Sequence, residues 1–155
     1  MRRIRAGALA LLFTLALVVS QVGAANAAGT SVKGVGSVII GGTTYDFSLS
    51  GAQVNKGGYT ILDHNNPKTR SVSGKASCFR TIGTNTAVIA GPASYKNQQI
   101  LGGGSFVLII AQEPNLIYIA TTTPTPTSTT LECPTDITGY DLVPIENGGY
   151  IDVTI

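Results

Sequence analysis

The chain has 155 residues, of which 43% are hydrophobic and 12% are charged, and its formal net charge is +2. This length corresponds to one domain with one hydrophobic core. The charged residues are sparse and form no basic run beyond the first residues, which excludes the positive surface that nucleic-acid binding requires. We therefore expect no nucleic-acid partner.

The first 27 residues have the pattern of a secretory signal peptide. Arg2, Arg3 and Arg5 precede the apolar run 6–22, and Ala-Asn-Ala at 25–27 forms an A-x-A cleavage site. The apolar run is at the short limit for crossing a membrane. We expect cleavage after Ala27, no transmembrane segment in the remaining chain, and a secreted or envelope-associated domain at 28–155. The short basic and apolar regions are typical of bacterial leaders.

The clearest hairpin signal lies at residues 32–50. Gly41-Gly42 separates two extended runs and predicts a two-residue turn of the primed type. The register that follows pairs three residues of the first run with larger residues of the second: Val38 with Tyr45, Gly36 with Phe47 and Gly34 with Leu49. Glycines beneath cross-strand aromatic residues permit strong curvature, which favours a small barrel over a flat sheet. A short strand is expected next, at 58–63.

Residues 71–91 predict two further strands, joined at Gly83-Thr84-Asn85. Because side chains alternate across a strand, Val72, Ala76 and Cys78 are expected on one face, toward the core. Cys78 and Cys133 are the two cysteines of the chain. An even pair in an exported protein is typical of a disulfide, and we expect these two residues to be bonded.

Residues 105–122 predict a hairpin in which both faces are apolar, with a four-residue loop at 112–115. Pairing across that loop would place Phe106, Leu108 and Ile110 with Ile117 and Ile119. The other face would carry a strip that includes Val107, Ile109, Leu116 and Tyr118. Two interpretations are open. In the first, residues 131–144 cover this face and are held there by a Cys78–Cys133 disulfide. In the second, the strip is exposed and serves self-association or binding of a partner.

The remaining chain contains a Thr/Pro-rich loop at 121–130, a segment of weak periodicity at 131–147 and a final strand at 150–155. The sum is about eight strands with no helix. The predicted fold class is all-β: a single antiparallel, barrel-like domain, with a β-sandwich as the alternative.

Four segments of the chain resemble a recurring pattern. They are GVG at 34–36 before YDFSL at 45–49, VSGKASC at 72–78, NTAVIAG at 85–91 and GGYIDV at 148–153. The pattern is similar to that of small exported bacterial β-proteins of unassigned function, in which V-x-G-x-V-x-C and N-x-A-x-I-x-G strands precede a closing G-N-x-x-V strand. The resemblance implies a compact antiparallel barrel-like fold and supplies no catalytic residues. The chain departs from it at 112–115 and in its Thr/Pro-rich insert.

Motifs for catalysis and for metal binding are missing from the sequence. His64 is the one histidine, it lies in a polar Asn/Pro turn, and no G-x-S-x-G elbow accompanies it. No EF-hand, H-E-x-x-H or paired C-x-x-C motif occurs. We predict no catalytic residues, no metal ligands and no cofactor.

The leading functional hypothesis is a non-enzymatic secreted or envelope-associated β-module with a structural or binding role. The first alternative is a small barrel that carries an apolar ligand. The second is a small extracellular hydrolase, which would need His64 or two carboxylates to converge in a pocket.

Overall fold

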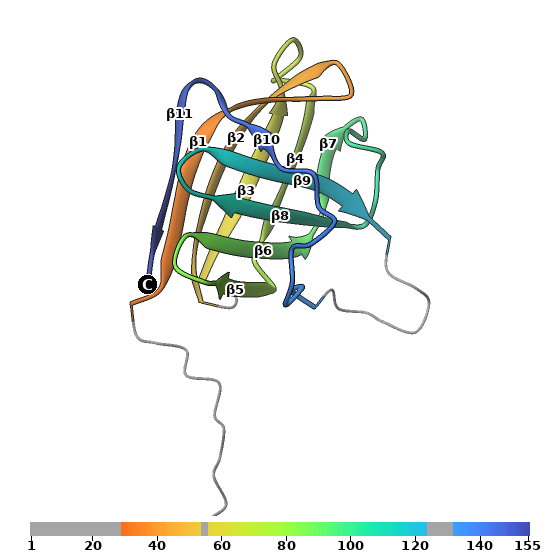
Figure 1. Cartoon of the computed structure of the whole chain (residues 1–155). Helices are drawn as coiled ribbons and strands as arrows, with labels where there is room; N and C mark the ends of the chain where they lie inside the picture. The colour runs from red at the N-terminus through yellow and green to blue at the C-terminus, as the bar shows by residue number, and fades with distance from the viewer. Residues whose placement is uncertain (1–28, 54–55, 124–131) are drawn as a thin grey trace, which may run out of the picture.

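The computed structural model describes residues 29–53, 56–123 and 132–155. These residues form eleven strands, against the eight expected, and contain no helix (Figure 1). The fold is therefore all-β, as predicted. The expected signal peptide at 1–27 and most of the expected Thr/Pro-rich loop, residues 124–130, lie outside the described residues.

The strands form two antiparallel sheets, a six-stranded sheet of order β11-β1-β2-β3-β4-β7 and a five-stranded sheet of order β10-β9-β8-β6-β5. The bounds in chain order are β1 Ser31–Ile40, β2 Thr43–Gln53, β3 Lys56–Asp63, β4 Arg70–Lys75, β5 Cys78–Ile82, β6 Thr86–Pro92, β7 Ser94–Asn97, β8 Phe106–Gln112, β9 Leu116–Thr122, β10 Val143–Pro144 and β11 Glu146–Thr154.

The strands of the five-stranded sheet run across those of the six-stranded sheet (Figure 1). This is an orthogonal sandwich, in which the chain turns corners from one sheet into the other. In the described residues no ladder of hydrogen bonds joins the edge strands of the two sheets. The closed barrel that we expected is therefore not formed, and the alternative, a sandwich, describes the fold.

The first hairpin has the predicted register. Val38 pairs with Tyr45, Gly36 with Phe47, and Gly34 with Leu49. Both residues of its turn, at 41 and 42, have positive φ, 56° and 79°, which favours glycine. The covered glycines also admit the edge strand β11, whose Ile151 side chain lies directly over Gly34. The absence of a side chain at these glycines thus lets side chains of neighbouring strands pack directly on the backbone of β1.

The stretch 71–91 differs from its prediction. Strand β4 ends at Lys75 in the six-stranded sheet, and after a corner at residues 76–77 the chain continues as β5 in the other sheet. Cys78 consequently packs on the outer face of the five-stranded sheet, whereas Val72 and Ala76 lie in the core between the sheets. The expectation that these three residues share one face was wrong because the strand does not continue through the corner. The turn at 83–85 joins β5 to β6 as predicted.

A second corner, at Gly91–Ala93, returns the chain from β6 to β7 and touches the first corner. A side chain on Gly91 would collide with the backbone carbonyl of Lys75, and one on Gly74 with the carbonyl of Pro92. The hydroxyl of Tyr59, on β3, is shared between the carbonyl oxygens of Pro92 at 2.7 Å and Gly91 at 3.0 Å. Burial, with a smaller effect of nearby Tyr95, raises the pKa of Tyr59, so its hydroxyl stays protonated and donates.

The five-stranded sheet is buried on both faces. Its inner face contributes Ile89, Ile109 and Ile117 to the main core, where they meet the inner face of the six-stranded sheet. Its outer face carries a second cluster around Val88 and Ile110. Side chains of the segment 132–142 cover this cluster. The covering side chains are Cys133, Ile137, Tyr140 and Leu142.

The hairpin of β8 and β9 is shifted by one residue from its expected register. Gln112 pairs with Leu116, so the loop has three residues, and Ile110 faces Tyr118 instead of Ile117. A shift by one residue exchanges the two faces of a strand. In the connecting loop, the Glu113 carboxylate accepts a hydrogen bond from the backbone N–H of Val153 at 2.7 Å. Glu113 thereby links the loop of one sheet to the edge strand of the other.

Cys78 and Cys133 form the predicted disulfide, with Cα atoms 5.7 Å apart and 55 residues of separation. The bond ties the covering segment 132–142 to β5 at the edge of the five-stranded sheet. A disulfide is compatible with an extracellular or otherwise oxidising location.

Replacing both cysteines with alanine tests the role of this bond. On the chain-entropy model, opening a loop of this length lowers the free energy of unfolding by about 4 kcal/mol. We expect hydrogen exchange to accelerate at the amides of Tyr140 and Ile145, which are bonded to Ile137 and Asn115, while amides of the β1–β2 hairpin keep their protection. Unchanged exchange in 132–145 would show that the disulfide does not hold the cover in place.

Candidate functional site

A row of hydroxyl side chains crosses the outer face of the six-stranded sheet. It consists of Ser48 on β2, Thr60 on β3, Ser73 on β4 and Ser94 on β7. These residues are direct cross-strand partners, Ser48 with Thr60, Thr60 with Ser73, and Ser73 with Ser94. All four are exposed. Because strands lie about 4.8 Å apart, the hydroxyl row presents polar groups at a regular spacing.

The hydroxyl row lines an open pocket of about 660 Å³. The next row of the sheet supplies Ser50, Gly58 and Lys75, which are also cross-strand partners. Gly58 contributes no side chain to the middle of this row, and the corner segment 92–93 lines the pocket as well. We call this site the hydroxyl pocket. Its shape depends on the same corner that Tyr59 holds.

The electrostatic character of the hydroxyl pocket is set by one side chain. Lys75 is the charged residue among the described residues that line the pocket, and it is exposed at the end of β4. Hydroxyl groups both donate and accept hydrogen bonds, whereas an ammonium group only donates. The pocket therefore suits a ligand that carries many hydroxyl groups.

The row of the sheet that contains the hydroxyls continues into an apolar end. Val35 on β1 pairs with Ser48, and Tyr150 on β11 pairs with Val35. Their exposed fractions, 42% and 49%, are high for large hydrophobic side chains. From Tyr150 to Ser94 the row crosses six strands, which corresponds to about 24 Å at the usual inter-strand spacing. One elongated surface thus combines an aromatic ring with hydroxyl groups.

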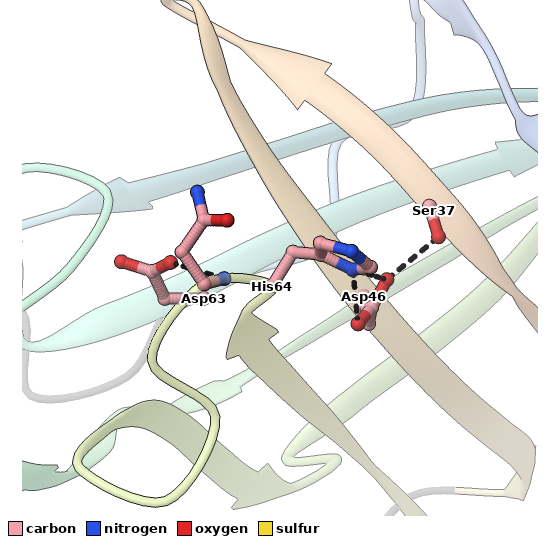
Figure 2. A network of polar contacts seen from close by, with 5 residues as sticks. Ser37, Asp46, Asp63 and His64 are labelled. Atoms are coloured by element: carbon pink, nitrogen blue, oxygen red, sulfur yellow. Dashed lines mark hydrogen bonds and ion pairs between the residues drawn. The ribbon is translucent and has the colours of Figure 1, made fainter.

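A polar cluster lies at the other end of β2 on the same face (Figure 2). The Ser37 hydroxyl donates to the Asp46 carboxylate at 2.6 Å, and His64 Nδ1 lies 2.9 and 3.1 Å from the two oxygens of that carboxylate. Asp46 is central, so Ser37 bonds to the aspartate and not to the histidine. A catalytic triad needs the histidine between serine and aspartate. This cluster consequently lacks the arrangement that would activate Ser37.

Opposing effects act on the Asp46 carboxyl. Burial raises its pKa, but hydrogen bonds from Ser37 and His64, together with the charge of His64, lower it more, so the pKa lies below its ordinary value of 3.8. A carboxyl whose pKa is lower in the folded than in the unfolded state contributes stability above the unfolded value. That contribution is lost as the pH falls from about 4 through the folded pKa.

The four residues of the predicted interaction strip do not lie together on one surface. Val107 and Ile109 are buried between the sheets, with exposed fractions of 0% and 1%. Tyr118 lies on the opposite face of the hairpin, where its ring meets the Tyr140 ring edge-on, with centroids 5.1 Å apart. Leu116 is half-buried at the start of β9. A covering segment is present, but it packs on the face of Leu108, Ile110 and Tyr118, and the other sheet covers Val107 and Ile109.

Other features bear on the predicted absence of metal sites and membrane spans. In residues 29–53, 56–123 and 132–155, no group of three or more His, Cys, Asp or Glu side chains could hold a metal ion. The same residues include no helix with the length and apolar character needed to cross a membrane.

Comparison of the chain with protein-family models, curated proteins and solved structures finds no match.

The hydroxyl pocket has no clear signature in the sequence. Alternation of serine and threonine with apolar residues was visible on each strand, and it indicated a solvated face. The pocket depends on which strands are neighbours, and in particular on β7, which lies in a stretch of weak pattern at 94–97. If β2, β3 and β4 had been aligned as neighbouring strands, the matching positions of Ser48, Thr60 and Ser73 would have indicated the hydroxyl row.

The Asp46 cluster yields a prediction on pH dependence. In Ser37→Ala, the loss of the hydroxyl donor should move the pKa of Asp46 up toward 3.8, and the stability that Asp46 loses on acidification below about pH 4 should become smaller. Carboxyl chemical shifts followed by NMR titration measure the pKa. Ser50→Ala is the matched control, an exposed serine on β2, the strand that carries Asp46. An Asp46 titration unchanged by Ser37→Ala would mean that this hydrogen bond does not lower the pKa.

Proposed function

We propose that this protein is an exported, non-enzymatic binding module, and that it binds a polysaccharide along the outer face of the six-stranded sheet. The hydroxyl row carries the proposal: Ser48, Thr60, Ser73 and Ser94 lie in register on adjacent strands and line one pocket. Export is the expectation from the N-terminal sequence, and the disulfide is compatible with it.

Sugars offer the groups that this face complements. A sugar ring presents hydroxyl groups at its rim, which can donate to and accept from serine and threonine hydroxyls. Its C–H faces are weakly apolar and pack on aromatic rings, for which Tyr150 offers an exposed apolar body with a polar tip. A chain of sugars could contact both ends of the row at once, because the row spans six strands.

The alternative functions have less support in this structure. A hydrolase would need a nucleophile or two carboxylates next to a base, and Ser37, Asp46 and His64 are connected in the wrong order for that chemistry. A carrier of apolar ligands would need a hollow interior. The space between the sheets is instead occupied by packed side chains, among them Ile61, Ile89 and Ile109.

Affinity electrophoresis of the full chain in gels that contain soluble polysaccharides tests this proposal. The panel includes a neutral glucan and a polyuronate, because Lys75 would favour an acidic polymer. We expect at least one polymer to retard the protein. The double variant Thr60→Val with Ser73→Ala should weaken that retardation about tenfold or more, since each lost hydrogen bond is worth about 0.5–1.5 kcal/mol. Tyr150→Ala should weaken it as well.

The sheet itself offers a matched control. Ser31 and Thr154 are another serine–threonine cross-strand pair on the outer face, and neither lines the hydroxyl pocket. Ser31→Ala with Thr154→Val should therefore leave retardation unchanged. The proposal is contradicted if no polysaccharide retards the chain, or if both double variants bind as the original chain does.

A further inference from the structure

The charged side chains on the outer face of the six-stranded sheet are distributed unevenly. The edge strands of this sheet are β7 and β11, on the right and left of Figure 1. Lys75 on β4 and Lys96 on β7 lie at one end of the hydroxyl row, and both are exposed. Glu146 and Asp152 lie on β11, at the other end. The hydroxyl row therefore runs from a cationic end to an acidic end.

The register of β4 and β7 places both lysines on the outer face. Val72 on β4 pairs with Tyr95 on β7, and both of these side chains pack in the core between the sheets. Side chains alternate across a strand, so Lys75 and Lys96 point the other way, toward solvent, as Ser94 does. The two ammonium groups are thus accessible from the same side as the hydroxyl pocket.

The two lysines bracket one position of the hydroxyl row. Ser73 pairs with Ser94, Lys75 follows Ser73 by two residues, and Lys96 follows Ser94 by two residues on the antiparallel neighbour. The lysines lie on opposite sides of this serine pair, four residue positions apart along the strands, which corresponds to about 14 Å between their Cα atoms. Lysine side chains are long and flexible. A sugar ring that lies over the serine pair would have an ammonium group on each side.

The charges of these lysines are not balanced by neighbouring carboxylates. The two ion pairs within the described residues involve neither lysine, and no carboxylate is among the described residues that line the hydroxyl pocket. At the other end of the row, Asp152 is the cross-strand partner of Lys33, and Glu146 is the partner of Ser37. An anionic group is consequently favoured at the β4–β7 end and disfavoured beside β11.

We propose that the polysaccharide bound by the hydroxyl pocket is acidic, and that one of its sugar carboxylates binds at the β4–β7 end between Lys75 and Lys96. This inference rests on the proposed function, since it concerns the same face. Ring hydroxyls contact Ser73 and Ser94, and the polymer extends from there toward Tyr150, where the carboxylates of β11 favour an uncharged sugar. Exposed ion pairs are individually weak, so the two lysines give a preference for acidic polymers and not tight binding by themselves.

NMR titration of the full, disulfide-bonded chain with trigalacturonate and with its methyl ester tests this assignment. The two probes have the same rings and ring hydroxyls, but the ester carries no charge. At low salt we expect the acid to bind about fivefold more tightly than the ester, with shifts at the amides of 73–75 and 94–96. Raising the salt to about 0.5 M should remove most of this preference, because exposed charges are then screened.

The outcomes separate this inference from the proposed function. Equal binding of the acid and the ester at low salt, or no binding of the acid at millimolar concentration, overturns the acidic assignment. The proposed function stands in that case as long as any polysaccharide retards the chain in the gel. If none does, the proposed function fails as well.

Variants separate the charge of the lysines from the fold. Lys75→Gln with Lys96→Gln should weaken binding of trigalacturonate about fivefold and leave binding of the methyl ester unchanged. Lys68→Gln with Arg80→Gln is the matched control, because it changes the net charge equally at exposed residues in the loop 64–69 and on β5, outside the hydroxyl pocket. The control should bind trigalacturonate as the original chain does. Undiminished binding by the folded lysine double variant, or an equal loss in the control, contradicts the proposal.

Discussion

The contact between the two corners of the sandwich is the constraint on which this structure depends. The chain leaves the six-stranded sheet after Lys75 and returns to it after Pro92, and the two passages touch backbone to backbone. Gly74 and Gly91 allow that approach because they have no side chain, and the Tyr59 hydroxyl is shared between two carbonyls of the second passage. The backbones of the two corners are joined here, in addition to the side-chain core that the two sheets share.

The same contact shapes the candidate binding face. Segment 92–93 lines the hydroxyl pocket, and β7, which begins directly after it, brings Ser94 into line with Ser73. The two sheets differ in what covers them. The five-stranded sheet is buried beneath the disulfide-bonded segment 132–142, whereas the outer face of the six-stranded sheet carries exposed hydroxyls. An exposed, polar and hollowed face opposite a largely covered one is the physical basis of the proposed function.

Local sequence patterns predicted three features. Side-chain alternation indicated the all-β class, and the two turn glycines fixed the register of the β1–β2 hairpin. The two cysteines, in a chain with an export-type N-terminus, indicated the disulfide. The closed barrel and the shared face of Val72 and Cys78 were wrong, because the corner after Lys75 carries no local signal. Gln112 was assigned to a loop by its polarity, and that shifted the β8–β9 register by one residue. The hydroxyl pocket depends on long-range neighbours, which a single sequence does not specify.

The most direct measurement of the central claim is the stability of Tyr59→Phe, which keeps the ring and removes the hydroxyl. If the Tyr59 hydroxyl joins the corners, the free energy of unfolding should fall by about 1–3 kcal/mol, since two carbonyls lose a buried donor. Hydrogen exchange should accelerate at Ser77, which is bonded to Ala90 across the corner. Tyr45→Phe, at another buried tyrosine of the same sheet, is the control. Unchanged stability and exchange in Tyr59→Phe would contradict the account.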